Sequence, residues 1–259
     1  MLEDFIRQSI LFLFTFLSTL FASVSGGGAG LIQFPLLIIL GLPFSIALGT
    51  HKVAAVFLGI GAICKKGKQS TFSIDKTVAL IMVLVGGSSV VLGSLLIVSI
   101  RTDIAQISLG LMIILCGFYS LIKKGFGSSK VKKRTIKRTL LGALTICIIG
   151  LFSGSLSSGA GFFTTITLVT VFGLELKRAI MHTMIFVSTF WNGIGAITIG
   201  AVSSICWQWL PCMIIAAFLG SYLGTSLLIK MPDKKVKLVF SLVSILSGVL
   251  LIMQEVFNI

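Results

Sequence analysis

The composition of this chain places it in a membrane. The chain has 259 residues, of which 56% are hydrophobic and only 11% are charged, and its mean hydropathy is +1.13. Such a chain has too little polar surface to cover a soluble core. We therefore expect an all-α polytopic membrane protein.

The formal net charge of +14 comes from short basic blocks between apolar segments. These blocks do not form the continuous surface that would follow a nucleic-acid backbone, whereas they are typical of loops kept in the cytoplasm. We expect membrane lipid around the chain and no nucleic-acid partner. The five cysteines show no C-x-x-C or metal-ligand spacing, so we interpret them as packing residues and expect no metal and no cofactor.

Eight apolar segments are each long enough to cross roughly 30 Å of hydrocarbon as a helix. In chain order they are residues 5–24, 45–64, 77–100, 104–122, 139–156, 179–203, 207–229 and 236–253. The first is too long for a cleaved signal peptide, so we expect it to be retained. Two further apolar pieces, 31–40 and 162–172, are too short to span as straight helices, and each follows a glycine-rich break.

The second half of the chain repeats short motifs of the first half in the same order. With an offset of 130 to 134 residues, Gly28-Ala29-Gly30 aligns with Gly159-Ala160-Gly161, and the pentapeptide at 59–63 recurs at 193–197. This series predicts an internal duplication.

The basic blocks predict how the two halves are oriented. An odd number of segments per half puts all the blocks on one side, whereas an even number would put residues 230–237 on the other side. We therefore expect two inverted repeats of about five segments each, with eight long helices and two short half-helices after the breaks. Residues 1–122 form the first repeat, 123–138 a basic cytoplasmic linker, and 139–259 the second repeat.

The two glycine-rich breaks are the predicted substrate site. Irregular backbone at membrane depth is tolerated only where protein or water satisfies it, and glycine permits the dihedral angles involved. The short helix after each break would direct free N–H groups at a small anion. The alternative is that the glycines only allow close helix packing. For a site, we expect positive φ angles at Gly28 and Gly161.

Polar residues near the breaks complete the predicted site. Ionisable residues at membrane depth, here His51, Lys52 and His182, are usually functional. Alternatively, Lys52 could extend to the interface, and a backbone carbonyl could satisfy each histidine. No motif suits a nucleophile, so we expect no catalytic residue. The predicted substrate-binding residues are Gly26, Gly27, Gly28, Gly30, Gln33, Thr50, His51, Lys52, Ser157, Ser158, Gly159, Gly161, His182, Thr183 and Asn192.

The motifs around the breaks also carry a family resemblance. They are Gly26 to Gly30, Pro35-Leu36-Leu37, Gly41-Leu42-Pro43 and Ala47-Leu48-Gly49-Thr50, with related residues at 153–161 and 179–183. This series resembles the TauE/SafE sulfite exporter family of membrane permeases. The resemblance implies transport of sulfite, thiosulfate, sulfoacetate or a related sulfonate across the bacterial inner membrane, without enzymatic chemistry.

His51 and Lys52 depart from the small or apolar residues that usually follow this threonine in the family, which leaves the choice of anion open. A thiol-handling membrane enzyme and a membrane assembly factor are the alternative functions. The sequence does not indicate an oligomeric state.

Overall fold

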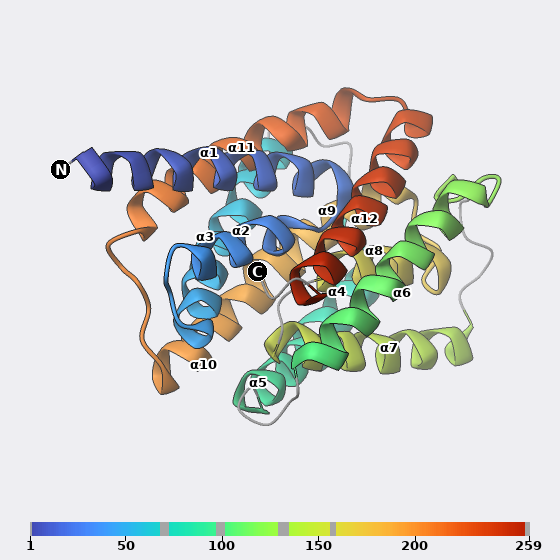
Figure 1. The fold of residues 1–259 in the computed structure, drawn as a ribbon. Helices are drawn as coiled ribbons and strands as arrows, with labels where there is room; N and C mark the ends of the chain where they lie inside the picture. The colour runs from blue at the N-terminus through green and yellow to red at the C-terminus, as the bar shows by residue number, and fades with distance from the viewer. Residues whose placement is uncertain (1, 68–72, 97–101, 129–134, 156–158, 257–259) are drawn as a thin grey trace.

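The computed structural model describes residues 2–67, 73–96, 102–128, 135–155 and 159–256, and these residues form a bundle of helices without a strand (Figure 1). The first half contains α1 (Leu2–Ser25), α2 (Ala29–Ile39), α3 (Phe44–Gly67), α4 (Lys76–Ile81), η1 (Met82–Gly86), α5 (Gly87–Leu95) and α6 (Thr102–Ile122). The second half contains α7 (Ile136–Ser155), α8 (Ala160–Thr170), α9 (Leu176–Thr183), η3 (Met184–Trp191), α10 (Asn192–Val202), α11 (Leu210–Lys230) and α12 (Asp233–Val256). The expected all-α fold is confirmed.

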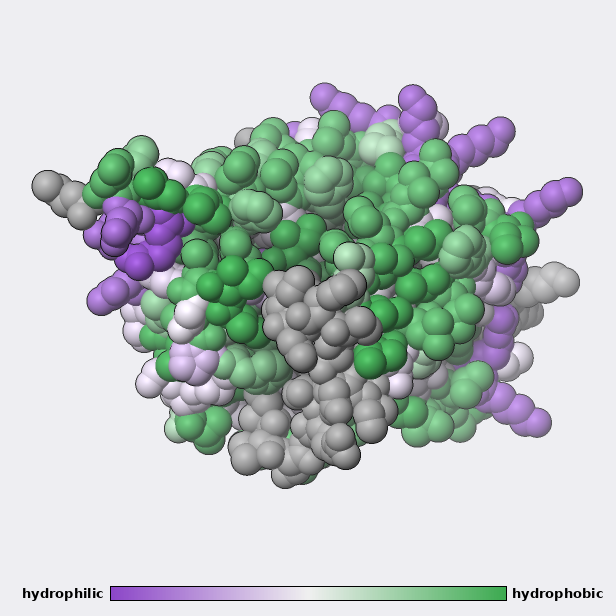
Figure 2. Space-filling model, viewed as in Figure 1, coloured by the Kyte–Doolittle hydropathy of each residue, from purple (hydrophilic) through white to green (hydrophobic). Residues whose placement is uncertain are grey.

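Within the described residues, seven helices are long and apolar enough to cross a membrane, and three shorter apolar helices accompany them. Figure 2 shows an apolar surface between two ends that carry hydrophilic side chains. Large apolar side chains such as those of Leu84, Leu144 and Leu246 are exposed. Such a surface suits contact with lipid, so the chain is a multi-pass membrane protein.

Two of the long helices contain a π-helical stretch, which the sequence did not predict. One helix runs through α4, η1 and α5, and the other runs through α9, η3 and α10. The Trp191 indole N–H in η3 donates to the carbonyl oxygen of Met82 in η1 at 2.7 Å. Trp191 is fully buried and lies against Gly86, where any side chain would overlap the ring. The two π-helical stretches therefore pack on each other.

The basic blocks gather at one end of the bundle. Lys237 Nζ at the start of α12 donates to the carbonyl oxygen of Lys123, just after α6, at 2.9 Å. Arg178 Nε in α9 donates to the carbonyl oxygen of Ser73, just before α4, at 2.8 Å. We call this end, where α6, α9 and α12 meet, the basic end.

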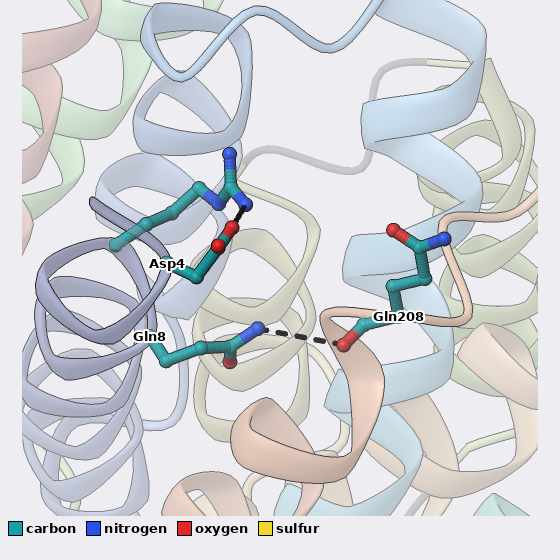
Figure 3. A network of polar contacts seen from close by, with 4 residues as sticks. Asp4, Gln8 and Gln208 are labelled. Carbon is teal, nitrogen blue, oxygen red and sulfur yellow. Dashed lines mark hydrogen bonds and ion pairs between the residues drawn. The ribbon is translucent and has the colours of Figure 1, made fainter. Parts of the chain in front are cut away.

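The opposite end, which we call the N-terminal end, joins the start of α1 to the segment before α11. Gln8 Nε2 donates to the carbonyl oxygen of Gln208 at 3.5 Å, and Arg7 pairs with Asp4 one turn earlier (Figure 3). The Arg7 guanidinium also lies over the Trp209 ring, 5.5 Å from its centroid. These contacts hold the first helix against the second half of the chain.

Two helical hairpins, α1–α2 and α7–α8, enter the bundle from opposite ends. Arg138 Nη2 near the start of α7 donates to the Thr170 carbonyl oxygen at the end of α8 at 3.2 Å, so this hairpin begins and ends at the basic end. In the other hairpin, α2 leads to Ser45, whose hydroxyl lies 3.0 Å from that of Ser203 near the N-terminal end. Because α2 and α8 have 11 residues each, each covers about half of a 30 Å core and re-enters without crossing it.

Candidate functional site

The tips of the two hairpins meet at their glycines. A Cβ added to Gly161 would lie 2.5 Å from the Gly26 carbonyl oxygen and 2.8 Å from Gly27 Cα. A Cβ added to Gly27 would lie 2.7 Å from the backbone nitrogen of Phe162. Only residues without a side chain allow two backbones to approach this closely. We call this contact between residues 26–27 and 161–162 the glycine crossing.

Helices α2 and α8 begin at the glycine crossing in the same way. Gly28 precedes α2 with φ 101°, and Gly159 precedes α8 with φ 78°; neither provides a side-chain hydrogen bond to the helix. The positive φ expected at Gly28 is confirmed, and Gly30 lies in the first turn of α2. The positive φ expected at Gly161 is wrong, because Gly161 already lies in the first turn of α8 and Gly159 makes the left-handed turn before it.

One buried polar pair joins each re-entrant helix to the helix that follows it. Gln33 Oε1 on α2 accepts from His51 Nδ1 on α3 at 2.7 Å, and Gln33 Nε2 donates to Thr15 Oγ1 on α1 at 3.1 Å. In the second half, the Oγ1 atoms of Thr165 and Thr183 lie 2.9 Å apart. Both pairs join residues 18 positions apart. The two halves therefore use different side chains for the same connection.

Lys52 brings a buried amino group to the second glycine break. Its side chain is 0% exposed, and its Nζ donates to the Ser153 carbonyl oxygen near the end of α7 at 2.7 Å. A positive charge is favourable at a helix C-terminus. Gly195 on α10 makes room for this side chain, since a Cβ there would lie 2.9 Å from Lys52 Cδ. The alternative in which Lys52 extends to the interface is wrong, because the amino group is held inside the bundle.

Thr50 and His182 make backbone contacts toward the two ends. Thr50 Oγ1 accepts from the Cys206 N–H at 3.0 Å, beside the N-terminal end. His182 Nδ1 donates to the Arg178 carbonyl oxygen at 2.8 Å, and its Nε2 accepts from the Asp75 N–H at 2.9 Å. His182 therefore fits the alternative of a histidine satisfied by the backbone, and the structure does not bring its ring to the glycine crossing.

Three predicted residues remain to be placed. Asn192 is the first residue of α10 and is 8% exposed. Ser157 and Ser158 lie outside the described residues.

The sequence did not indicate the partners that hold the polar residues in place. Thr165 could have been found, because its spacing to Thr183 equals that from Gln33 to His51. Gly195 belongs to the repeated pentapeptide, which indicated only the duplication. No sequence pattern connects Lys52 with a carbonyl oxygen 101 residues away.

A bundle of apolar helices with two re-entrant hairpins that meet inside it is typical of membrane transport proteins. Comparison with known proteins agrees with this class. Residues 11–251 match the family described as "Sulfite exporter TauE/SafE". The chain belongs to this family.

Individual relatives are named as transporters, not as enzymes. The chain is 28% identical over 221 residues to a "Probable membrane transporter protein" of Haemophilus influenzae, covering 85% of this chain and 84% of that protein. It is 26% identical over 237 residues to "Probable membrane transporter protein YfcA" of Escherichia coli K12, covering 91% and 86%. It is also 26% identical over 239 residues to "Probable membrane transporter protein ORF9" of Sinorhizobium sp, covering 92% and 89%. No solved structure shows a significant match.

Proposed function

We propose that this membrane permease moves a small sulfur-containing anion across the bacterial inner membrane through the glycine crossing. The anion is sulfite, thiosulfate, sulfoacetate or a related sulfonate. The observation that carries the proposal is the meeting of two helix N-termini, each preceded by a left-handed glycine and without a side-chain cap. Helix N-termini bind anions through free N–H groups and a partial positive charge.

Inverted repeats, residues 1–122 and 139–259, are the frame we propose for transport. The equal length of α2 and α8, their matching glycine caps and the entry of their hairpins from opposite ends all support this relation. The packing of α11 on α1 and of α5 on α7 is a further correspondence. Inverted repeats place a substrate site near the midplane, where each side can open in turn.

The basic linker, residues 123–138, faces the cytoplasm in this proposal. Cytoplasmic loops carry an excess of lysine and arginine, and the basic blocks gather at one end of the bundle. Single cysteines at Ser128, Lys234 and Gln208, labelled in intact cells and in inverted vesicles, test the orientation. We expect Ser128 and Lys234 to be labelled from the cytoplasmic side and Gln208 from the other. Labelling of Ser128 and Lys234 from opposite sides would contradict the proposal.

Moderate binding strength suits this role, since an anion held too tightly could not leave. The proposed partners are the first amide groups of α2 and α8, the Gln33–His51 pair and the Lys52 amino group.

A cell interior that is negative by about 100 mV favours the exit of one negative charge by roughly 2.3 kcal/mol. Export therefore needs no coupling ion, and export or facilitated flux is the direction that we propose.

The test is flux through purified protein in liposomes. The panel consists of sulfite, thiosulfate, sulfoacetate, sulfate and chloride, and the variants are Gly161→Ala and its control Gly193→Ala. We expect saturable flux of at least one sulfur anion in the wild type and in Gly193→Ala, and a large loss in Gly161→Ala. Equal flux in Gly161→Ala and in the wild type would contradict the proposal, and so would the absence of flux for every sulfur anion of the panel.

A variant without cysteines separates the permease from a thiol-handling enzyme. The five cysteines are free and lie on different elements. Their replacement by alanine should leave the flux intact. Loss of flux in this variant, with folding preserved, would favour the thiol-handling alternative.

A further inference from the structure

A cavity of about 900 Å³ lies at the basic end, and the sequence did not predict it. Segments from both halves of the chain line it: the residues before α4, after α6 and before α9, the end of α11 and the start of α12. Its basic lining residues are Lys124, Lys177, Arg178, Lys234 and Lys237. The cavity is separate from the glycine crossing and therefore needs its own explanation.

The cavity is electropositive even after its acidic residues are counted. Asp75, Glu175 and Asp233 face the five basic side chains, which leaves a formal excess of two positive charges. The side chains of Lys124 and Lys234 are exposed and make no hydrogen bond or ion pair with another residue of the described part. Two lysine amino groups without a polar partner in the described part are therefore available to an anion from solution.

A column of three aromatic rings leads from the cavity to the first glycine break. Phe126 lines the cavity and is otherwise buried, and its ring stacks on Phe240 with centroids 6.0 Å apart. Phe240 in turn meets Phe162 edge to face, also at 6.0 Å. The ring of Phe162 lies against Gly28, where an added Cβ would be 3.0 Å from it. The three rings are apolar, and the Tyr119 ring meets Phe126 edge to face at 6.1 Å.

We infer that the cavity is a vestibule that collects small oxyanions at the basic end, and that the Phe126–Phe240–Phe162 column is the gate between it and the glycine crossing. An apolar constriction blocks ions because it removes their water without replacing it. Each anion must therefore wait in the vestibule until the rings separate. This inference rests on the proposed function in one respect, which is that the substrate passes through the vestibule. The charge of the vestibule and the closure of the column can be tested without measuring transport.

Thiol-reactive probes of opposite charge test the vestibule. In the variant without native cysteines, Ser128→Cys reports the cavity and Gln208→Cys reports the N-terminal end. The probes are a methanethiosulfonate that carries a sulfonate and one that carries a trimethylammonium group. Two net charges about 8 Å away enrich the anion and deplete the cation by about fourfold each at ~10 mM salt, and by about twofold each at ~150 mM.

We therefore expect the sulfonate probe to label Ser128→Cys on the order of tenfold faster than the cationic probe at low salt, after normalisation to Gln208→Cys. Combining Lys124→Gln with Lys234→Gln removes the excess charge of the lining and should lower the ratio on the order of tenfold. The charges of residues 130–134 are the same in the parent and in this variant, so they do not account for the decrease. Equal rates for the two probes in the parent, or a ratio that the two lysine changes leave unaltered, would overturn the vestibule.

A cysteine beyond the column tests the gate. Ser247 on α12 is 3% exposed, and its hydroxyl is 3.2 Å from the position of a Cβ on Gly28. We expect Phe240→Ala to raise sulfonate labelling of Ser247→Cys from the basic end at least tenfold. Phe34→Ala is the control, because it removes another buried ring in the separate apolar cluster at the N-terminal end.

The outcomes of this test distinguish a gate at Phe240 from a general increase in accessibility that the loss of any buried ring would cause. If Phe240→Ala does not fold, Phe240→Leu gives the same comparison with a smaller void. Labelling that is equal with and without the Phe240 ring, or that Phe34→Ala raises as much, would overturn the gate. Neither result depends on flux, so a failure of the inference is distinguishable from a failure of the proposed permease.

Discussion

Gly161 offers a sharp test of the glycine crossing, because its φ is not in the left-handed region. Alanine there is compatible with the backbone, and any effect must come from the added methyl group. That group would lie 2.5 Å from the Gly26 carbonyl oxygen and 2.8 Å from Gly27 Cα. Both neighbours are backbone atoms, so a rotamer change cannot relieve the overlap and the two hairpins must separate.

The expected penalty follows from these contacts. Overpacking a tight site costs about 1–3 kcal/mol, and overlap with backbone on both sides places Gly161→Ala near the upper value. The higher helix propensity of alanine than of glycine stabilises the folded state by about 1 kcal/mol and offsets part of this cost. At the control position Gly193, an added Cβ would be no closer than 3.8 Å to Val56. Gly193→Ala therefore has no overlap penalty and only gains the helix propensity of alanine. The two variants should therefore differ by roughly 3 kcal/mol in the free energy of unfolding.

Thermal unfolding in detergent and flux in liposomes measure the two consequences. We expect Gly161→Ala to unfold several degrees below Gly193→Ala and to lose at least tenfold in flux. Equal unfolding temperatures and equal flux would show that the hairpin tips are not in close contact, and would remove the basis for a site there.

Further predictions concern the polar residues. Lys52→Met should reduce anion flux at least tenfold while the protein still folds, because a buried amino group is expensive and methionine fills its space; Lys52→Met flux equal to wild type would exclude a role in binding. In a double-mutant cycle of Gln33→Leu and His51→Leu, unfolding should show a coupling of about 1 kcal/mol or more, and additive effects would contradict a direct bond. Lys177→Ala should cost less than about 1 kcal/mol of stability, because its partner Asp233 is 78% exposed; a larger loss would show that this pair supports the basic end.

The long helices were predictable because membrane helices are specified by local composition. The segment predicted at 45–64 is Phe44–Gly67 in the structure, and the short segment predicted at 31–40 is Ala29–Ile39. The breaks were predictable from local sequence as well, because clustered glycines indicate a position where a helix can end. Hydropathy and glycine content were therefore enough for the fold class and for the location of both breaks.

Contacts between distant segments were not predictable in this way. The π-helical stretches depend on Trp191 reaching Met82, and a periodic pattern contains no information about such a contact. His182 shows the same limit, because only the packed structure reveals that Asp75 and Arg178 already satisfy its ring. The vestibule is a third case: its basic blocks were interpreted as signals of orientation, and only the fold brings them around a common cavity.

The two halves of the site are related but not equal, and the difference suggests how binding is coupled to movement. The offset that places His51 on Thr183 places Lys52 on Met184, so only one of the two halves contributes a cation. In the described state its ammonium bonds to the Ser153 carbonyl oxygen at the end of α7. A ligand shifts a conformational equilibrium only as far as it binds the two states differently. We propose that an anion bound near the second glycine break competes with this carbonyl for the ammonium, and that the competition weakens a link between α3 and the second hairpin. In this proposal, the loss of the Lys52–Ser153 bond on anion binding is the step at which binding favours a rearrangement of one half against the other.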